Sequence, residues 1–266
     1  MQKGLESANL PSNTVQLVEN TDREAVSAML TSTGEIDIII PRGGKSLVKK
    51  IQDEARVPVF AHLEGLCHVY VDKDADINKA VRLIVNSKMR RTGICGALET
   101  LLIDRHISEK AVPIIVKNLS KSGCQIRGDI ETKQIVNEIE LASEKDWHTE
   151  YLDLIISIRV VKNIDEAIEH INFYGSSHSD AIVTDNKESS KKFLAEVDSS
   201  SVYVNASTRF TDGAEFGMGA EIGIATGKMH ARGPVGIEQL TTFKTYLILC
   251  RISISCSRFF VNKIFK

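Results

Sequence analysis

Short, mainly apolar runs alternate with segments of helical periodicity along most of this 266-residue chain, and this alternation restricts its possible folds more than any other feature. The apolar runs predict strands at 15–18, 36–40, 57–61, 69–71, 98–103, 154–161, 181–184 and 202–204. The periodic segments predict helices at 25–30, 46–54, 77–85, 165–170 and 188–197, with another that Ser108 caps and Gly123 ends. Apolar strands joined by helices form parallel sheets covered on both faces, so we expect the α/β class. Ligands of such sheets gather at the carboxyl ends of the strands.

The composition is that of an ordinary globular protein, because 42% of the residues are hydrophobic and 33 Lys and Arg balance 35 Asp and Glu. A formal charge of -2 gives no electrostatic footprint for nucleic acid, and we expect no such partner. The amino terminus lacks the apolar core of a signal peptide, and no uncharged apolar run approaches the roughly 18 residues of a membrane span. Five cysteines without paired C-x-x-C spacing do not indicate a disulfide framework. We therefore expect a cytoplasmic protein without membrane association.

Cys95 is the candidate nucleophile among the five cysteines. Gly93 and Gly96 flank it in a predicted turn, and Arg90 and Arg91 stand immediately upstream. Glycines let a ligand approach the backbone closely, and neighbouring guanidinium groups lower the pKa of a thiol from its reference of about 8.5. The alternative is an incidental turn cysteine.

The other chemistry-bearing residues give weaker patterns. Cys67 lies beside a predicted strand and is expected in the core, whereas Cys124 follows a helix stop and is expected at the surface without activating neighbours. The seven histidines are scattered and form no H-E-x-x-H motif, so we expect no metal site. A nucleophile elbow of the type G-x-S-x-G is also missing from the sequence.

The turn formed by Arg42, Gly43, Gly44 and Lys45 resembles the end of a phosphate-binding loop. The leading glycine of that motif would fall at Ile39, inside a predicted strand, so the motif itself fails. A turn from strand to helix with free backbone N–H groups and two cations is still suited to hold a phosphate at the helix N-terminus. The alternative is a glycine turn needed only for chain reversal.

Two segments depart from the regular alternation. Residues 205–236 are rich in glycine and poor in regular periods, which favours a set of functional loops. Residues 241–266 carry five Lys and Arg, five aromatic residues and no Asp or Glu, which is typical of a sticky or disordered terminus or of contact with an anionic surface.

The segment RTGICGALETLL at 91–102 resembles the gamma-glutamyl phosphate reductase family of the aldehyde dehydrogenase superfamily. The resemblance is collinear and extends to about residue 244. It also includes the segments 40–45, 62–72, 149–153, 204–213, 216–223, 230–236 and 240–242. It implies an aldehyde dehydrogenase-like fold, in which a partial Rossmann-like cofactor domain precedes an α/β catalytic domain.

The resemblance implies that Cys95 is the nucleophile of an NADP-dependent oxidoreductase of proline biosynthesis. In the implied reaction, the thiolate attacks L-glutamyl 5-phosphate, phosphate leaves, and NADPH reduces the thioester to glutamate 5-semialdehyde. Glu150 falls at the position of a glutamate that contacts the nicotinamide ribose in the wider superfamily. His62 or Glu64 is nearest to a glutamate that activates water in hydrolytic relatives, and either residue could be purely structural.

Other site residues follow from charge and from the turn described above. Arg42, Gly43 and Gly44 are expected to bind the cofactor. The loop of Ser207, Thr208 and Arg209 offers hydroxyls and a cation for the carboxylate of the amino-acid substrate.

The resemblance also sets the expected domain limits: a remaining part of the dinucleotide-binding domain at 1–61, a catalytic domain at 62–236, and an atypical tail at 237–266 in place of an oligomerisation segment. Family members carry a long stretch ahead of the first residue here, so a truncated, frame-altered product is one hypothesis. Two functions stay open, an active reductase, for which we expect a homo-oligomer, and an inactive remnant that keeps the catalytic fold without binding NADPH.

Overall fold

A seven-stranded, wholly parallel sheet forms the centre of the molecule in the computed structural model, which describes residues 1–246 and 264–265. The strand order is β4-β3-β5-β2-β1-β6-β7, and each neighbouring pair runs parallel. The strands are β1 (Cys67–Val71), β2 (Leu98–Asp104), β3 (Gln125–Gly128), β4 (Glu140–Leu141), β5 (Ile155–Val161), β6 (Ser179–Val183) and β7 (Ser201–Val204). The expected α/β class is confirmed.

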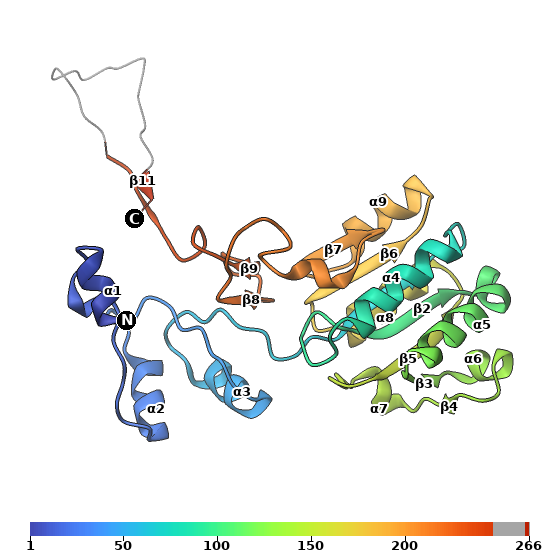
Figure 1. Cartoon of the computed structure of the whole chain (residues 1–266), viewed down its shortest axis with the longest axis horizontal. Coiled ribbons are helices and arrows are strands. Elements are labelled where there is room, and N and C mark those ends of the chain that lie inside the picture. Colours follow the sequence, from blue (N-terminus) through green and yellow to red (C-terminus); the bar gives the residue numbers. More distant parts are fainter. Residues whose placement is uncertain (247–263, 266) are drawn as a thin grey trace, which may run out of the picture.

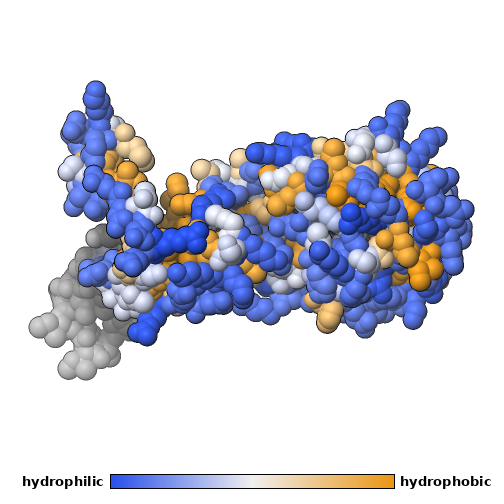
Figure 2. Space-filling view, turned by 90° about the horizontal axis from the view of Figure 1, so that it is seen from below, coloured by the Kyte–Doolittle hydropathy of each residue, from blue (hydrophilic) through white to orange (hydrophobic). Residues whose placement is uncertain are grey.

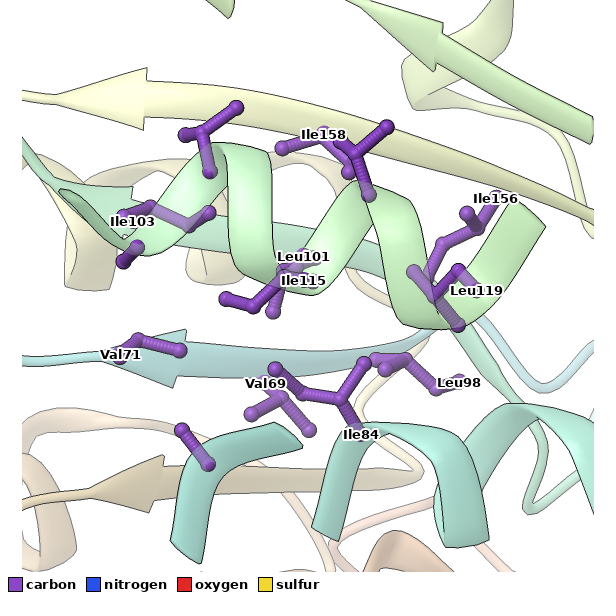
Figure 3. Close-up of a cluster of buried hydrophobic side chains, with 14 of the residues drawn as sticks. Val69, Val71, Ile84, Leu98, Leu101, Ile103, Ile115, Leu119, Ile156 and Ile158 are labelled. Atoms are coloured by element: carbon purple, nitrogen blue, oxygen red, sulfur yellow. The ribbon is translucent and has the colours of Figure 1, made fainter. Parts of the chain in front are cut away.

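Helices cover both faces of this sheet. They are α4 (Ile77–Met89), α5 (Arg105–Lys121), α6 (Ile130–Ile135), α7 (Glu144–Trp147), α8 (Ile164–Tyr174) and α9 (Lys187–Glu196). Val69 and Leu101 point to the face where Ile84 of α4 and Ile115 of α5 pack (Figure 3). Their neighbours Tyr70 and Leu102 face α8 and α9. The pleat turns successive side chains to opposite faces, so every residue of β1 and β2 is buried.

Most helix limits agree with the sequence pattern, with one clear correction. Asp104, not Ser108, caps α5: its carboxylate accepts a hydrogen bond from the backbone N–H of His106, and Ser108 lies inside the helix. The strand β2 therefore passes directly into the helix, and Asp104 is both the last residue of the strand and the N-cap of the helix. Gly123 follows the end of the helix with φ +87°, as expected of a helix stop.

The strands expected at 15–18, 36–40 and 57–61 do not join the sheet. Residues 15–18 form no strand, and the other two segments meet only in an isolated bridge between Ile39 and Val59. This bridge has two hydrogen bonds: the N–H of Ile39 donates to the carbonyl of Pro58, and the N–H of Phe60 donates to the carbonyl of Ile39. The ladder ends there because Pro41 and Pro58 have no N–H with which to extend it. The N-terminal helices are α1 (Gln2–Ser7), α2 (Arg23–Thr31) and α3 (Lys45–Glu54), and Figure 1 shows them beside the sheet rather than on its faces.

The glycine-rich segment is mostly loop, as expected. It contains the short helix η2 (Thr208–Thr211) and the antiparallel pair β8 (Gly223–Ala225) and β9 (Gly233–Val235). In Figure 1 this pair lies between the N-terminal helices and the sheet. The space-filling view shows orange apolar groups scattered among blue hydrophilic ones over one face of the molecule (Figure 2). The proposed domain limits at 61 and 236 stay a prediction.

Beyond residue 236 the structure describes only part of the tail. There, β10 (Phe243–Lys244) pairs with β11 (Ile264–Phe265), and the expectation for most of the basic-aromatic tail falls on residues 247–263 and 266, outside the described residues. Within the described residues, no helix has the length and apolarity needed to cross a membrane.

Candidate active site

The candidate site lies at the amino ends of the strands, and the expectation of a site at their carboxyl ends is wrong. Helix α4 runs back from the carboxyl end of β1, so the loop with Cys95 precedes β2. Glu150 likewise precedes β5, and His178 precedes β6. At the carboxyl ends of the strands, buried polar side chains bond to one another, and the hydroxyl of Tyr70 donates a 2.7 Å hydrogen bond to Asp104. The loops at the amino edge therefore carry the candidate chemistry.

A cavity of about 640 Å³ opens at this edge and brings most of the predicted site residues together. The N-terminal segment contributes one wall, the loops before β1, β2 and β5 another, and η2 with the strand β8 the rest. Its lining includes Arg42, Gly43, Gly44, Lys45, His62, Glu64, Cys95, Gly96, Glu150, Thr208, Arg209 and Glu221. Segments spread between residues 40 and 224 thus meet around one thiol.

The Cys95 thiol lines this cavity and is partly exposed, so it is open to a small molecule. Its pKa is raised to about 11, chiefly by burial and then by the carboxylates of Glu150 and Glu221, while Arg42 opposes them. The expectation that Arg90 and Arg91 lower this pKa is therefore wrong. The Arg90 guanidinium instead pairs with Glu215 at 2.8 Å, outside the cavity lining. The resting group is a protonated thiol.

The backbone around Cys95 is held by the loop before β1. A Cβ atom on Gly65 would lie 2.0 Å from the carbonyl oxygen of Cys95. The thiol of Cys67 donates to the same carbonyl at 3.1 Å, and Cys67 is fully buried, as expected. Cys124 is also buried, at 5% exposure, so the expectation of a surface position is wrong. It packs between α5 and β3, where its side chain joins the core.

Glu150 projects into the cavity but is also engaged with the protein. Its Oε1 accepts a 2.8 Å hydrogen bond from the backbone N–H of Gly65, and burial raises its pKa. The loop after Glu150 is held in place by β2, because the N–H of Leu152 donates to the carboxylate of Glu99 at 3.3 Å. Glu99 in turn forms a fully buried ion pair with Lys88 at 2.7 Å. Nothing in the sequence pattern identified this buried pair.

The glycine turn starts α3, as the sequence suggested. Gly44 is the N-cap of this ten-residue helix and supplies no side-chain hydrogen bond. The first helical residue, Lys45, reaches across to Glu64 at 2.6 Å. Glu64 is therefore paired with a cation at the cavity wall, and the helix N-terminus faces the same hollow as the thiol.

The three residues of the predicted carboxylate-binding loop differ in what they contact. Ser207 is outside the cavity lining, and its hydroxyl lies 2.8 Å from that of Ser87. Thr208 is fully buried and donates to the carbonyl of Gly96 at 2.8 Å. Arg209 lines the cavity, and its buried Nε has no hydrogen-bond partner among the described residues. Arg209 is thus the member of this loop best placed to receive an anion.

Two histidines stand beside the thiol, although the sequence spacing predicted no metal site. The ligand atoms of His62, Cys95 and His178 lie within 4.8 Å of one another, and the two rings meet edge-on with centroids 5.1 Å apart. These residues are far apart in the sequence, so no spacing motif could reveal the cluster. His178 has no sequence signature at all, whereas His62 belongs to the segment that carries the family resemblance.

The comparison with known proteins agrees with this architecture. Residues 1–139 match the Aldehyde dehydrogenase family, and the chain belongs to that family. It is 57% identical over 243 residues to a gamma-glutamyl phosphate reductase of Brucella suis biovar 1, covering 91% of this chain and 58% of that protein. It is 58% identical over 245 residues to one of Methylobacterium sp. (strain 4-46), covering 92% and 57%. The chain therefore spans less than two thirds of the length of these relatives.

Solved structures give the same result. A gamma-glutamyl phosphate reductase from Thermotoga maritima superimposes with a TM-score of 0.91 at 48% identity, covering 95% of this chain and 61% of that one. An acetylating aldehyde dehydrogenase from Geobacillus thermoglucosidasius, at 20% identity and a TM-score of 0.64, shares the fold over 87% of this chain and 61% of its own. The resemblance stated from the sequence is confirmed.

Proposed function

We propose that this chain acts in the NADPH-dependent reduction of L-glutamyl 5-phosphate to L-glutamate 5-semialdehyde, with release of phosphate. The observation that carries the proposal is the open position of Cys95 in a cavity that also contains Arg42, Glu150 and Arg209. The 57% identity to relatives named gamma-glutamyl phosphate reductase supports the choice of substrate. The fold alone would support only the wider class of aldehyde dehydrogenases.

The chemistry begins with nucleophilic attack by the thiolate. The sulfur of Cys95 bonds to the acyl carbon of the substrate, the bond from that carbon to the phosphate oxygen breaks, and inorganic phosphate leaves a thioester on the enzyme. When bound, NADPH supplies the hydride that reduces this thioester. The thiohemiacetal formed on Cys95 then breaks at its carbon–sulfur bond, which releases the aldehyde and returns the thiol.

The raised pKa of Cys95 means that a base has to take the thiol proton before attack. His62 is suited to this step because its Nδ1 lies 2.9 Å from the carbonyl oxygen of Ile224, which requires Nδ1 to carry the ring proton. The lone pair then resides on Nε2, and His62 belongs to the same cluster as the Cys95 thiol. A nucleophile, a base and a group that orients the base are the three parts of an activated thiol site.

The residues present fit a nicotinamide dinucleotide at the cavity. A Cβ atom on Gly44 would meet nothing within 4 Å, so open space lies in front of the first amides of α3, where a cofactor phosphate can be held. Arg42 and Gly43 belong to the same wall, and the carboxylate of Glu150 is suited to accept hydrogen bonds from ribose hydroxyls. Binding would then orient the cofactor toward Cys95.

The substrate carboxylate is assigned to Arg209. Its guanidinium is partly desolvated, which lowers its pKa from the usual value, and its Nε lacks a partner among the described residues. A carboxylate would satisfy this group with a charge-assisted hydrogen bond. The hydroxyls of Ser207 and Thr208 then stabilise the loop rather than bind the substrate, because they form hydrogen bonds with Ser87 and with the carbonyl of Gly96.

The test measures the reverse reaction, phosphate-dependent reduction of NADP with glutamate 5-semialdehyde. Cys95→Ser should abolish the rate while leaving NADPH binding, followed by nicotinamide fluorescence, unchanged. Cys124→Ser is the matched control, since this buried cysteine lies outside the cavity lining, and should keep the rate. Loss of activity in Cys124→Ser with activity retained in Cys95→Ser would overturn the assignment.

The same titration decides between this function and an inactive remnant. A chain that keeps the catalytic fold but shows no saturable NADPH binding would be the remnant. The specific observation that favours this alternative is that residues 36–40 and 57–61 share only one bridge and do not join the sheet. Homo-oligomer formation stays a prediction that light scattering would test.

A further inference from the structure

We propose that His62, Cys95 and His178 form a three-ligand site for Zn²⁺, and that an ion bound there switches off the thiol nucleophile. One thiolate and two imidazoles are the donor set that zinc prefers, since the soft sulfur and the borderline nitrogens exclude Mg²⁺ and Ca²⁺. The regulatory half of the proposal rests on the proposed function, whereas the binding half does not.

The three ligand atoms are already gathered. They lie within 4.8 Å of one another, and tetrahedral coordination with Zn–S of about 2.3 Å and Zn–N of about 2.0 Å separates neighbouring ligand atoms by roughly 3.5 Å. No pair of ligand atoms therefore has to approach by more than about an ångström to complete the coordination. Cys95 and His62 both line the open cavity, so the ion has an entry path from solvent.

The histidines are oriented as metal ligands usually are. His62 presents Nδ1 to the carbonyl oxygen of Ile224 at 2.9 Å, which leaves Nε2 as the unprotonated nitrogen. His178 presents Nδ1 to the hydroxyl of Ser179 at 2.8 Å. A hydrogen bond from the remote ring nitrogen to a carbonyl or similar group fixes the tautomer and the ring orientation of a ligating histidine.

The unsatisfied nitrogen of His178 is an independent observation. His178 is fully buried, and its Nε2 has no hydrogen-bond partner among the described residues. Buried ring nitrogens are ordinarily paired, and an orphan of this kind calls for an unfilled partner. A cation held with Cys95 and His62 would satisfy it.

An ion at this position blocks the reaction for two reasons. The sulfur lone pair that would attack the acyl phosphate is donated to the metal, and the Nε2 lone pair of His62 that would accept the proton is also taken. The cavity supplies the fourth coordination position, which a water molecule can fill. Bound zinc therefore acts at the nucleophile itself, without competing for the site of Arg209.

The test uses the full chain with Cys250 and Cys256 changed to serine, so that no tail thiol contributes. After treatment with a chelator, the protein is titrated with Co²⁺ as a spectroscopic stand-in and with Zn²⁺ by displacement. We expect one ion per chain and a thiolate-to-cobalt charge-transfer band. Cys95→Ser should abolish the band, and His62→Gln and His178→Gln should each weaken binding by about tenfold or more.

His148→Gln is the matched control, because this exposed histidine lies outside the cluster, and it should bind Co²⁺ with unchanged affinity. The circular dichroism of His178→Gln shows whether that buried substitution folds, and His62→Gln tests the site if it does not. Unchanged cobalt binding in both Cys95→Ser and His62→Gln would overturn the proposal.

Activity separates this proposal from the proposed function. Zinc binding through the three residues in a chain without reductase activity would uphold the site and reject the function. Reductase activity that Zn²⁺ inhibits and a chelator restores would uphold both. An active chain that neither binds nor responds to Zn²⁺ would reject the metal site alone.

Discussion

The α-carbon of Gly65 packs against the backbone of Cys95, so closely that a Cβ atom would lie 2.0 Å from the Cys95 carbonyl oxygen and 2.5 Å from its Cα. The loop before β1 therefore determines where the thiol stands at the entrance to β2. The backbone N–H of Gly65 also donates to Glu150, so this glycine contacts both the nucleophile and the carboxylate that we propose binds the cofactor.

Gly65→Ala should therefore displace Cys95 and reduce the reductase rate by about 100-fold or more, because an ångström of misplacement costs about that much. Gly227→Ala is the control, since a Cβ there meets nothing within 4 Å. The measurement is the phosphate-dependent rate, with thermal unfolding to confirm folding. An undiminished rate in Gly65→Ala would show that the backbone contact does not position the thiol.

Lys88→Met should strongly destabilise the protein. It leaves Glu99, fully buried and paired with Lys88 at 2.7 Å, without its cation, and breaking such a pair costs about 3–5 kcal/mol in the free energy of unfolding. The pKa of Glu99 is raised by burial to about 7 even though Lys88 lowers it, and loss of Lys88 should raise it further, so the cost should grow as urea unfolding is repeated at increasing pH above 7.

The double variant Lys88→Met, Glu99→Leu should recover most of that loss, because an apolar pair removes both buried charges. The backbone N–H of Leu152 would then lose its acceptor, so we expect weaker NADPH binding in the refolded double variant. A double variant no more stable than Lys88→Met would contradict this account of the pair.

Asp146 should make stability depend on pH in the acid range. Burial by itself would raise its pKa, but hydrogen bonds from Ser143, Arg127 and Tyr151 outweigh burial and hold the pKa well below 3.8. Because the native pKa lies below the unfolded one, the stabilisation is present above about pH 4 and is lost as the pH falls further.

Asp146→Asn should therefore be less stable than the parent at neutral pH by about 1–3 kcal/mol, and the difference should shrink as the pH falls below 4. Urea midpoints across this range provide the measurement. Asp53→Asn, which alters an exposed helix pair with Lys49, is the control and should stay within about 0.5 kcal/mol at every pH. A constant difference for Asp146→Asn would show that its carboxylate does not titrate as described.

Arg209→Met should raise the KM for glutamate 5-semialdehyde by about 10- to 100-fold, the equivalent of one hydrogen bond to a charged group. Arg90→Met is the control because Arg90 pairs with Glu215 and lies outside the cavity lining. Steady-state kinetics with varied semialdehyde gives the measurement. Equal KM values in both variants would remove Arg209 from the substrate site.

The local patterns of the sequence were sufficient for much of the fold. Mainly apolar runs such as 98–103 and 181–184 became strands of the sheet because helices cover both of its faces, so most positions are buried and favour apolar side chains. The same patterns were wrong at 36–40 and 57–61, since an apolar run does not specify its pairing partner. The family motif around Cys95 identified the thiol itself.

Tertiary structure decided the environment of that thiol. The sequence places Arg90 and Arg91 next to Cys95, yet in the fold the carboxylates of Glu150 and Glu221 affect its pKa more strongly. The fold also brings His62 and His178, which are 116 residues apart in the sequence, to the sulfur of Cys95. Residue types and short motifs encode which groups are available, but burial, charge and contact depend on distances in space, which only the packing of the sheet and its loops determines.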